Sequence, residues 1–215
     1  MTYVSWAALY EGGMDEAYFE LLIPRIMEDI LRHHGTRNST IPPAPAVRLH
    51  RDSVEKVAHE ACAARDAFHL VFIHADTGGR AMEVDLSDRS MRYCEAMHAV
   101  CRLPLARCVV IAPRHETEAW VLADPNAVTA AFGYTGSVDS LGLPASAADA
   151  ERLDDPKATL AAAMTRVRGR RRRPDIRQIV PAIAQRQSLD TLRQTRSFAM
   201  FEASLRIALS DLGCV

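Results

Sequence analysis

The chain has 215 residues, with 48% hydrophobic and 25% charged side chains and a formal net charge of −1. This composition is typical of a globular protein with a sizeable core, and it excludes a chain that is disordered throughout. No apolar run approaches the roughly 18 residues of a membrane span, and the N-terminus lacks the basic, apolar and small-residue order of a signal peptide. We therefore expect a cytoplasmic protein without membrane association.

The first third of the chain alternates strand-like apolar runs with helical periodicity. A glycine-containing turn, Tyr10-Glu11-Gly12-Gly13, ends the first apolar run. Asp52 followed by Glu55 has the form of a capping box ahead of a helix. The pattern predicts strands at 3–9, 46–50 and 68–73, and helices around 19–31 and 54–61.

The middle of the chain repeats this alternation. An apolar stripe along 91–101 predicts a third helix, and the β-branched run 108–112 predicts a strand that Pro113 ends. The next helix carries Trp120 and Leu122 as buried anchors. Strands that alternate with helices indicate an α/β fold, with a mainly parallel sheet covered by helices on both faces.

The last third of the chain is expected to be helical. Asp155 followed by Pro156 is a strong helix start, and apolar periodicity predicts further helices at 176–183 and 198–209. We expect an α/β domain at 1–135 and a helical, arginine-rich extension at 136–215 that packs on the same domain.

The cysteines show no pattern of a metal or redox site. They are odd in number and have no Cys-x-x-Cys spacing. We expect small buried apolar side chains in a reducing compartment. The five are Cys62, Cys94, Cys101, Cys108 and Cys214.

Acidic residues follow three of the predicted strands: Glu11, Asp76, and the pair Glu116 and Glu118. The carboxyl ends of parallel strands lie at one edge of a sheet, so these side chains are expected to converge on one crevice. Carboxylates at close range raise one another's pKa unless a cation lies between them, and Mg²⁺ suits such a site. The alternative is structural, because turns and the first turn of a helix also favour acids.

A run of arginines precedes the last predicted helices. Such a cluster matches the electrostatic footprint of phosphate or nucleic-acid binding, although a solvated loop is the alternative. No aromatic residue is interleaved, so binding is expected to be independent of sequence and sensitive to salt. The run consists of Arg168, Arg170, Arg171, Arg172 and Arg173.

Several of these segments together resemble a known bacterial family. Glu11-Gly12 follows the first strand, an aspartate follows a central strand, and Glu116 to Asp124 read Glu-x-Glu-Ala-Trp-x-Leu-Ala-Asp. With Asp154-Asp155-Pro156-Lys157 and Ser197-Phe198-x-x-Phe201, this order resembles a bacterial Toprim-like family of unknown function. Its fold is similar to the Toprim domains of topoisomerases, primases and overcoming-lysogenization-defect nucleases.

The resemblance implies a catalytic site formed by Glu11, Asp76 and Glu118. Glu11 corresponds to the Toprim glutamate, and Asp76 corresponds to the second acid of the Toprim Asp-x-Asp. His74 stands where the first aspartate would be, and histidine is a poorer ligand for Mg²⁺ than for Mn²⁺ or Zn²⁺. Glu118 could supply the missing charge, as could Glu83 or Asp85, so the implied metal site comprises Glu11, Asp76, Glu118 and His74.

Two functions follow from these observations. The first is a nuclease that depends on Mg²⁺ or Mn²⁺; the resemblance implies an ATPase partner and a role in bacterial defence. The second is a non-catalytic module that binds nucleic acid or protein through a degenerate Toprim site. A small-molecule phosphotransferase is less favoured because no Gly-x-x-x-x-Gly-Lys-Ser/Thr loop is present.

Overall fold

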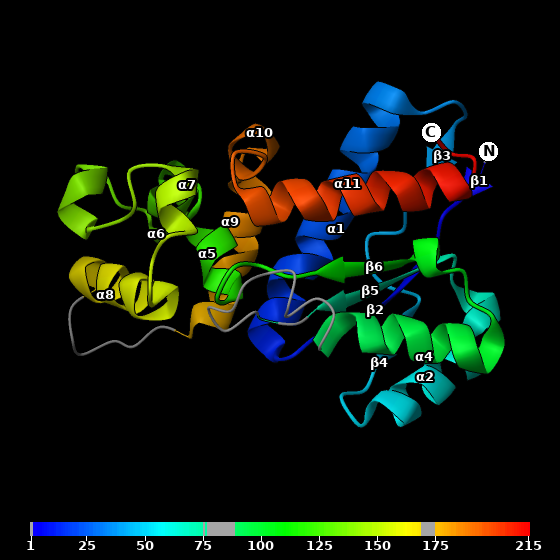
Figure 1. The fold of residues 1–215 in the computed structure, drawn as a ribbon. Coiled ribbons are helices and arrows are strands. Elements are labelled where there is room, and N and C mark those ends of the chain that lie inside the picture. The colour runs from blue at the N-terminus through cyan, green and yellow to red at the C-terminus, as the bar shows by residue number, and fades with distance from the viewer. Residues whose placement is uncertain (1, 75, 77–88, 169–174) are drawn as a thin grey trace.

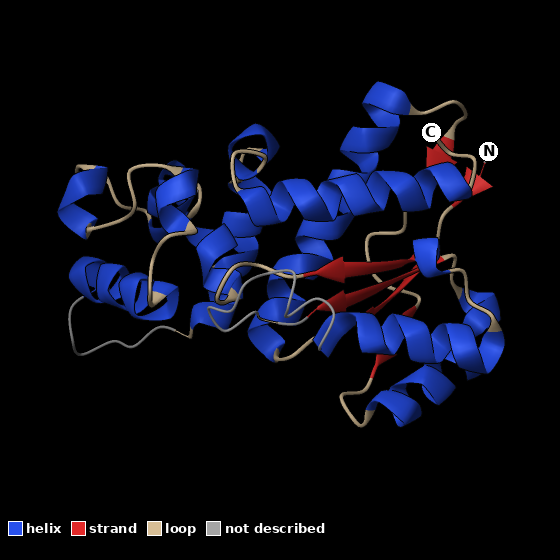
Figure 2. Ribbon diagram, viewed as in Figure 1, coloured by secondary structure: helices blue, strands red, loops and turns tan. Residues whose placement is uncertain are grey.

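A computed structural model describes residues 2–74, 76, 89–168 and 175–215. Its central feature is a four-stranded sheet in the order β4-β2-β5-β6, in which every strand pair is parallel. The sheet and its helices confirm the predicted α/β class, and they are consistent with a Toprim-like arrangement (Figures 1 and 2). The strands are β2 (Trp6–Leu9), β4 (Val47–Leu49), β5 (Leu70–His74) and β6 (Cys108–Ile111).

The predicted first strand is divided into two parts. Its start, β1 (Thr2–Tyr3), pairs with β3 (Ser39–Thr40) in a separate small parallel sheet. Only β2 enters the central sheet, and Val4 and Ser5, which belong to neither strand, separate it from β1. The N- and C-termini lie close to this small sheet (Figure 1).

Alternating side chains of the strands form two cores. Trp6 and Phe72 face a core that includes α1 (Gly13–His34) and α11 (Arg196–Asp211). Ala7 and Ile73 face the opposite core, with α2 (Val54–Ala63) and α4 (Met91–Cys101). Because both faces are buried, the strands read as nearly continuous apolar runs.

The remaining helices lie largely beyond the carboxyl ends of the strands (Figure 1). The first core extends from Val4 to Cys214, so residues on both sides of the predicted boundary at 135 share it. Within the described ranges, no helix combines the length and apolarity that crossing a lipid bilayer requires. The helices beyond the strand ends are α5 (Thr117–Leu122), α6 (Pro125–Phe132), α7 (Ala147–Ala150), α8 (Pro156–Arg168), α9 (Val180–Arg186) and α10 (Leu189–Leu192), with the 3₁₀ turns η4 (Val138–Leu141) and η5 (Ile176–Gln178). Two further 3₁₀ turns, η1 (Arg65–Ala67) and η3 (Leu105–Arg107), precede β5 and β6 at the amino ends of these strands.

Two predicted helix starts have different outcomes. Asp155 caps α8 by accepting a hydrogen bond from the Ala158 amide at 2.7 Å, as expected. The predicted capping residue of α2 was wrong by one position. Ser53, not Asp52, accepts from the Lys56 amide, because Asp52 binds the Ser53 amide and the Lys56 ammonium group instead.

The expectation of unpaired cysteines was wrong for four of the five. Disulfides join Cys62 to Cys101 and Cys94 to Cys108, with Cα atoms 5.7 and 5.6 Å apart. They connect α2 to α4 and α4 to β6, so the pairing depends on contacts between elements that sequence spacing does not display. Disulfides persist mainly in oxidising compartments, so the cysteines no longer support a reducing one.

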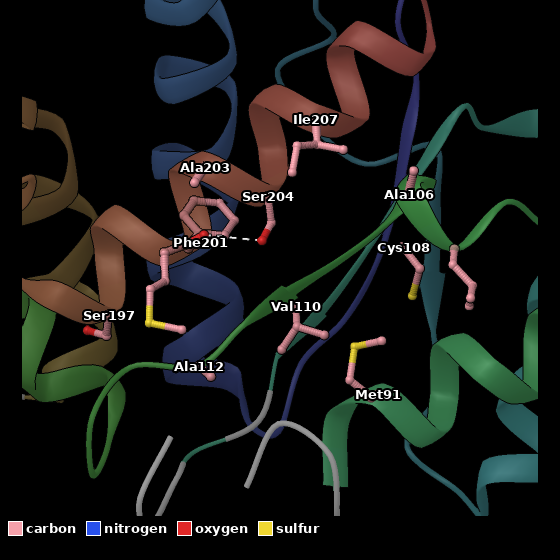
Figure 3. Close-up of a pocket in the computed structure, with 12 residues that line it drawn as sticks. Met91, Ala106, Cys108, Val110, Ala112, Ser197, Phe201, Ala203, Ser204 and Ile207 are labelled. Carbon is pink, nitrogen blue, oxygen red and sulfur yellow. Dashed lines mark hydrogen bonds between the residues drawn. The ribbon is translucent and has the colours of Figure 1, made fainter. Parts of the chain in front are cut away.

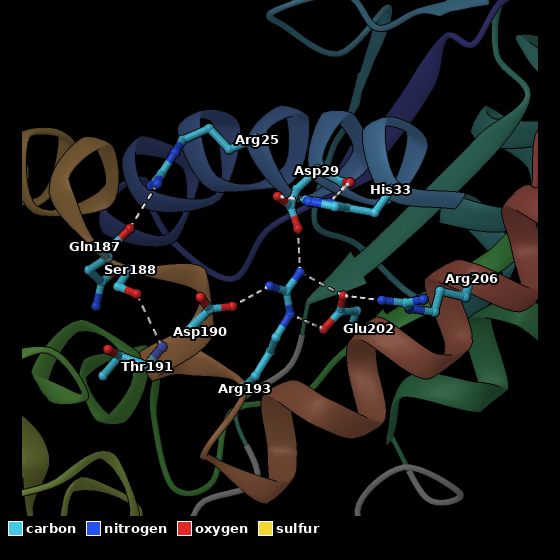
Figure 4. A network of polar contacts seen from close by, with 10 residues as sticks. All are labelled: Arg25, Asp29, His33, Gln187, Ser188, Asp190, Thr191, Arg193, Glu202 and Arg206. Carbon is cyan, nitrogen blue, oxygen red and sulfur yellow. Dashed lines mark hydrogen bonds and ion pairs between the residues drawn. The ribbon is translucent and has the colours of Figure 1, made fainter. Parts of the chain in front are cut away.

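An ion-pair network fixes the C-terminal helices to α1 (Figure 4). Arg193 contacts Asp29 of α1, Asp190 of α10 and Glu202 of α11, and the Glu202 side chain is only 7% exposed. Arg206 also pairs with Glu202, at 3.1 Å. A single guanidinium group thus links acids from three helices.

We expect Arg193→Ala to lower the free energy of unfolding by about 2–3 kcal/mol, because it leaves the nearly buried Glu202 carboxylate with Arg206 alone. Arg152→Ala, which removes an exposed pair with Asp149, is the matched control and should cost less than about 1 kcal/mol. Urea unfolding of both variants measures the difference. Equal effects would contradict a special role for Arg193.

Candidate functional site

The candidate site is centred on His74, the last residue of β5, which is only 2% exposed. Its Nε2 atom lies 3.0 Å from the Thr117 hydroxyl and 3.3 Å from Asp76 Oδ1. Its Nδ1 atom lies 3.8 Å from Asp15 Oδ2 and has no hydrogen-bond partner in the described part of the chain. Two carboxylates and one hydroxyl therefore surround a buried imidazole.

Thr117 links the two carboxylates of this network. Its hydroxyl donates to Asp15 Oδ1 at 2.7 Å, and its main-chain amide donates to Asp76 Oδ1 at 3.1 Å. Asp15 is in the first turn of α1, just after the turn that follows β2. The network thus joins the carboxyl end of β5, the start of α1 and the start of α5.

The connection from β6 to α5 makes this arrangement possible. His115 has φ of 65°, a left-handed conformation that is uncommon for a residue other than glycine. The Glu116 amide then donates to the Arg114 carbonyl oxygen at 3.0 Å, which closes a tight turn. This turn directs the first amide of α5 at Asp76.

Two opposing effects act on the pKa of His74. Burial alone would lower the pKa, because it disfavours the charged imidazolium. The hydrogen bond to Asp76 and the charges of Asp15, Asp76 and Glu11 outweigh this and raise the pKa of His74 above its ordinary value. The network therefore favours a positively charged histidine among the carboxylates.

Glu116 and Glu118 form the acidic side of the site. Glu118 is only 5% exposed, and its burial, together with the charges of Glu116 and Asp76, raises its pKa to about 7. Burial and Asp76 also raise the pKa of Glu116, and the Glu116 Oε2 atom is buried without a hydrogen-bond partner in the described residues. Lys157, at the start of α8, opposes both shifts.

The C-terminal helices hold α5 in place. The Trp120 indole donates to the Ser197 hydroxyl at 2.7 Å, and the Gln187 side-chain amide donates to the Trp120 carbonyl oxygen at 2.6 Å. Glu151 in turn accepts from the Ser197 amide at 2.8 Å. Trp120 and Leu122 are fully buried, which confirms their predicted role as anchors.

The structure places the predicted site residues in two groups. Asp76 and Glu118 lie beside His74 and form, together with Glu116, what we call the acidic cluster. Glu11 lies next to Arg51. The Arg51 guanidinium group is 4.0 Å from the Glu11 carboxylate and donates a hydrogen bond to the main-chain carbonyl oxygen of Glu11 at 3.2 Å. Arg168 is exposed at the end of α8. Arg170, Arg171, Arg172 and Arg173, like Glu83 and Asp85, lie outside the described residues.

The negative charge of the acidic cluster suits a cation, but its side chains are not arranged as a coordination site. Burial and the charge of Asp76 raise the pKa of both Glu116 and Glu118, and Glu116 Oε2 lacks a hydrogen-bond partner in the described residues. Across the described ranges, however, no three Asp, Glu, His or Cys side chains are arranged closely enough to coordinate one ion. A metal would therefore need these carboxylates to close around it.

A separate apolar cavity of about 390 Å³ lies between α11, β6 and the start of α4 (Figure 3). Met91, Val110, Phe201 and Ile207 are among its lining residues. None of the lining residues is an acid, a base or a histidine, so this cavity does not suit phosphate chemistry.

Reasoning from sequence missed Asp15 and Thr117. Thr117 lies between two acids that the strand-end argument selects, so its position could have suggested a supporting role. Asp15 is hidden because an acid in the first turn of a helix is common for electrostatic reasons alone.

No protein-family model, curated protein or solved structure matches the chain.

We expect Glu118→Gln to stabilise the protein at high pH. The folded-state pKa of Glu118 is about 7, against an ordinary value of 4.5, so folding keeps a proton that the unfolded chain releases between these pH values. The wild-type stability should therefore fall as pH rises through this window, and glutamine removes this loss, which reaches about 3 kcal/mol at most.

Urea unfolding in EDTA at pH 5 and pH 8 measures this effect. The gain from Glu118→Gln should be several times larger at pH 8. Glu95→Gln, at an exposed position of α4, is the control and should show no pH-dependent difference. A variant that gains equally at both pH values would contradict the raised pKa.

Proposed function

We propose that this protein is a divalent-metal-dependent phosphodiesterase that cleaves nucleic acid. The observation that supports it most is the meeting of Asp76, Glu116 and Glu118 beside His74. These acids follow two neighbouring parallel strands, at the edge of the sheet where ligands bind in open α/β folds. Carboxylate oxygens are the ligands that Mg²⁺ and Mn²⁺ prefer.

In this proposal, Asp76, Glu116 and Glu118 hold the metal. A bound Mg²⁺ or Mn²⁺ supplies an oriented water and stabilises charge on the phosphate oxygens. The unpaired oxygen of Glu116 supports its role as a ligand, because a buried carboxylate oxygen without a partner is costly.

The neighbouring polar residues act by positioning. The Thr117 amide holds Asp76 Oδ1, and His74 contacts the same oxygen. His74 thereby balances part of the acidic charge. Glu11, which adds to the charge around His74, remains a predicted catalytic residue on the side of Arg51.

The biological setting stays a prediction from the resemblance. The ATPase partner and the role in bacterial defence are inferred only from the resemblance of Glu116–Asp124, and of the other segments quoted with it, to the Toprim-like family. Contact with nucleic acid through the arginine run is part of the same proposal.

A binding module is the second candidate. It is favoured by the finding that no set of three ligands among the described residues is arranged around a common point. In that case the acids would be structural, and binding would depend on basic residues instead.

Cleavage assays separate the two candidates. With Mn²⁺, the purified protein should cleave labelled single- or double-stranded DNA or RNA, and EDTA should stop the reaction. Asp76→Asn and Glu118→Gln should each lower the rate by about 100-fold or more, whereas Glu95→Gln should keep it. Activity that survives both site substitutions would overturn the proposed function.

Metal binding provides an independent test. Crystals soaked in Mn²⁺ should give an anomalous peak bound by at least two of Asp76, Glu116 and Glu118. Crystals of Asp76→Asn should lose most of it, because one charged ligand is removed. A well-ordered site without a peak would favour the binding module.

A further inference from the structure

The two outer strands of the central sheet, β4 and β6, differ in how their edges are protected. An outer strand presents main-chain donors and acceptors that another strand can pair with, so proteins commonly guard it with charged side chains. The middle residue of β4 is the exposed Arg48, which pairs with Glu16 and Glu20 at 3.2 and 2.6 Å. In contrast, β6 reads Cys-Val-Val-Ile, and in the described part of the chain it pairs with β5 alone. The β6 edge therefore lacks the protection that the β4 edge has.

The apolar cavity of about 390 Å³ lies along this unprotected edge (Figure 3). Its floor includes Cys108, Val110 and Ala112, and Val110 is the partly exposed residue of β6. Two of its lining residues are unusually exposed for apolar side chains, Leu105 at 44% and Ile207 at 61%. Since α11 covers one face of the sheet and α4 the other, the cavity lies where a further strand would continue the sheet.

The exposed side of α11 also differs from that of an ordinary surface helix. Surface helices usually present charged residues to water, as α2 does with Glu55, Lys56 and His59. Along α11, which lies wholly within the described ranges, the exposed positions between its ends are uncharged. They are Ala199, Ala203, Ser204, Ile207 and Ser210.

The charged groups around this surface are already paired within the chain. The partly exposed Arg206 binds Glu202 at 3.1 Å, and Asp211, at the end of α11, binds Arg107 at 2.7 Å. We call β6, the exposed side of α11 and the start of α4 the β6 surface. A surface of this kind does not suit nucleic acid, which requires free positive charge. It resembles the apolar, charge-depleted centre of a protein interface.

We propose that a second copy of the chain covers the β6 surface, through antiparallel pairing of β6 with β6 about a two-fold axis. With Val110 opposite Val110, Cys108 lies opposite Ala112, and the side chains on each face of one sheet continue those of the other. Such a contact uses the same residues of both copies and closes at two chains. Pairing of β6 with β4 would instead add copies without limit, and Arg48 opposes it.

The β6 surface is large enough for a stable dimer. With 16 residues, α11 is about 24 Å long. Two helices and the strand between them are roughly 25 Å wide, so each copy would contribute about 600 Å², which reaches the lower end of the range for stable interfaces. The two sheets would become one sheet with the acidic clusters at opposite edges. This inference goes beyond the proposed function and does not depend on it.

Sedimentation velocity over a range of micromolar concentrations tests the dimer. The wild-type protein should approach twice the mass of one chain as concentration rises. Ile207→Lys should weaken the dimer about tenfold or more, because it places an unpaired charge in the apolar contact. Ile207 is exposed in the single chain, so this variant should keep its fold, which circular dichroism checks. Tyr3→Lys, at a 56% exposed position of the separate small sheet, is the matched control and should keep the dimer.

Hydrogen exchange identifies the strand that forms the contact. At equal protein concentration, amides of β6 should exchange more slowly in the wild type than in Ile207→Lys, whereas amides of β4 should exchange alike in both. A wild-type protein with the mass of one chain at every concentration would overturn the proposal, as would growth beyond two chains. A dimer that Ile207→Lys retains, or one without protection of β6, would also overturn it.

Discussion

The arrangement of the site depends on one buried group, the imidazole of His74. A buried histidine with a raised pKa needs carboxylates close by, and here Asp15 and Asp76 supply them through two different elements. Thr117 then bonds both acids, which fixes where α5 begins. The positions of Glu116 and Glu118 follow from that start. The acidic cluster is thus a consequence of how the fold satisfies a buried charge.

The C-terminal helices are part of this arrangement and not an accessory to it. A helix of six residues such as α5 has little stability of its own, so tertiary contacts must hold it. Trp120 provides them through burial against Phe198 and Phe201 and through its hydrogen bond to Ser197. Because Ser197 is bonded to Glu151, the segment after α6 also supports α5. The geometry of the acids therefore depends on residues more than 70 positions away in the chain.

The parts that sequence could predict are those with a local signal. Apolar runs and helical spacing locate the parallel strands and the helices around them, and the strand-end argument places Asp76 and Glu118 at one edge. Other features depend on contacts between distant elements. Asp15 reaches Thr117 across 102 positions, and the pairing of Cys94 with Cys108 requires α4 to pack beside β6. Neither has a periodicity in the sequence.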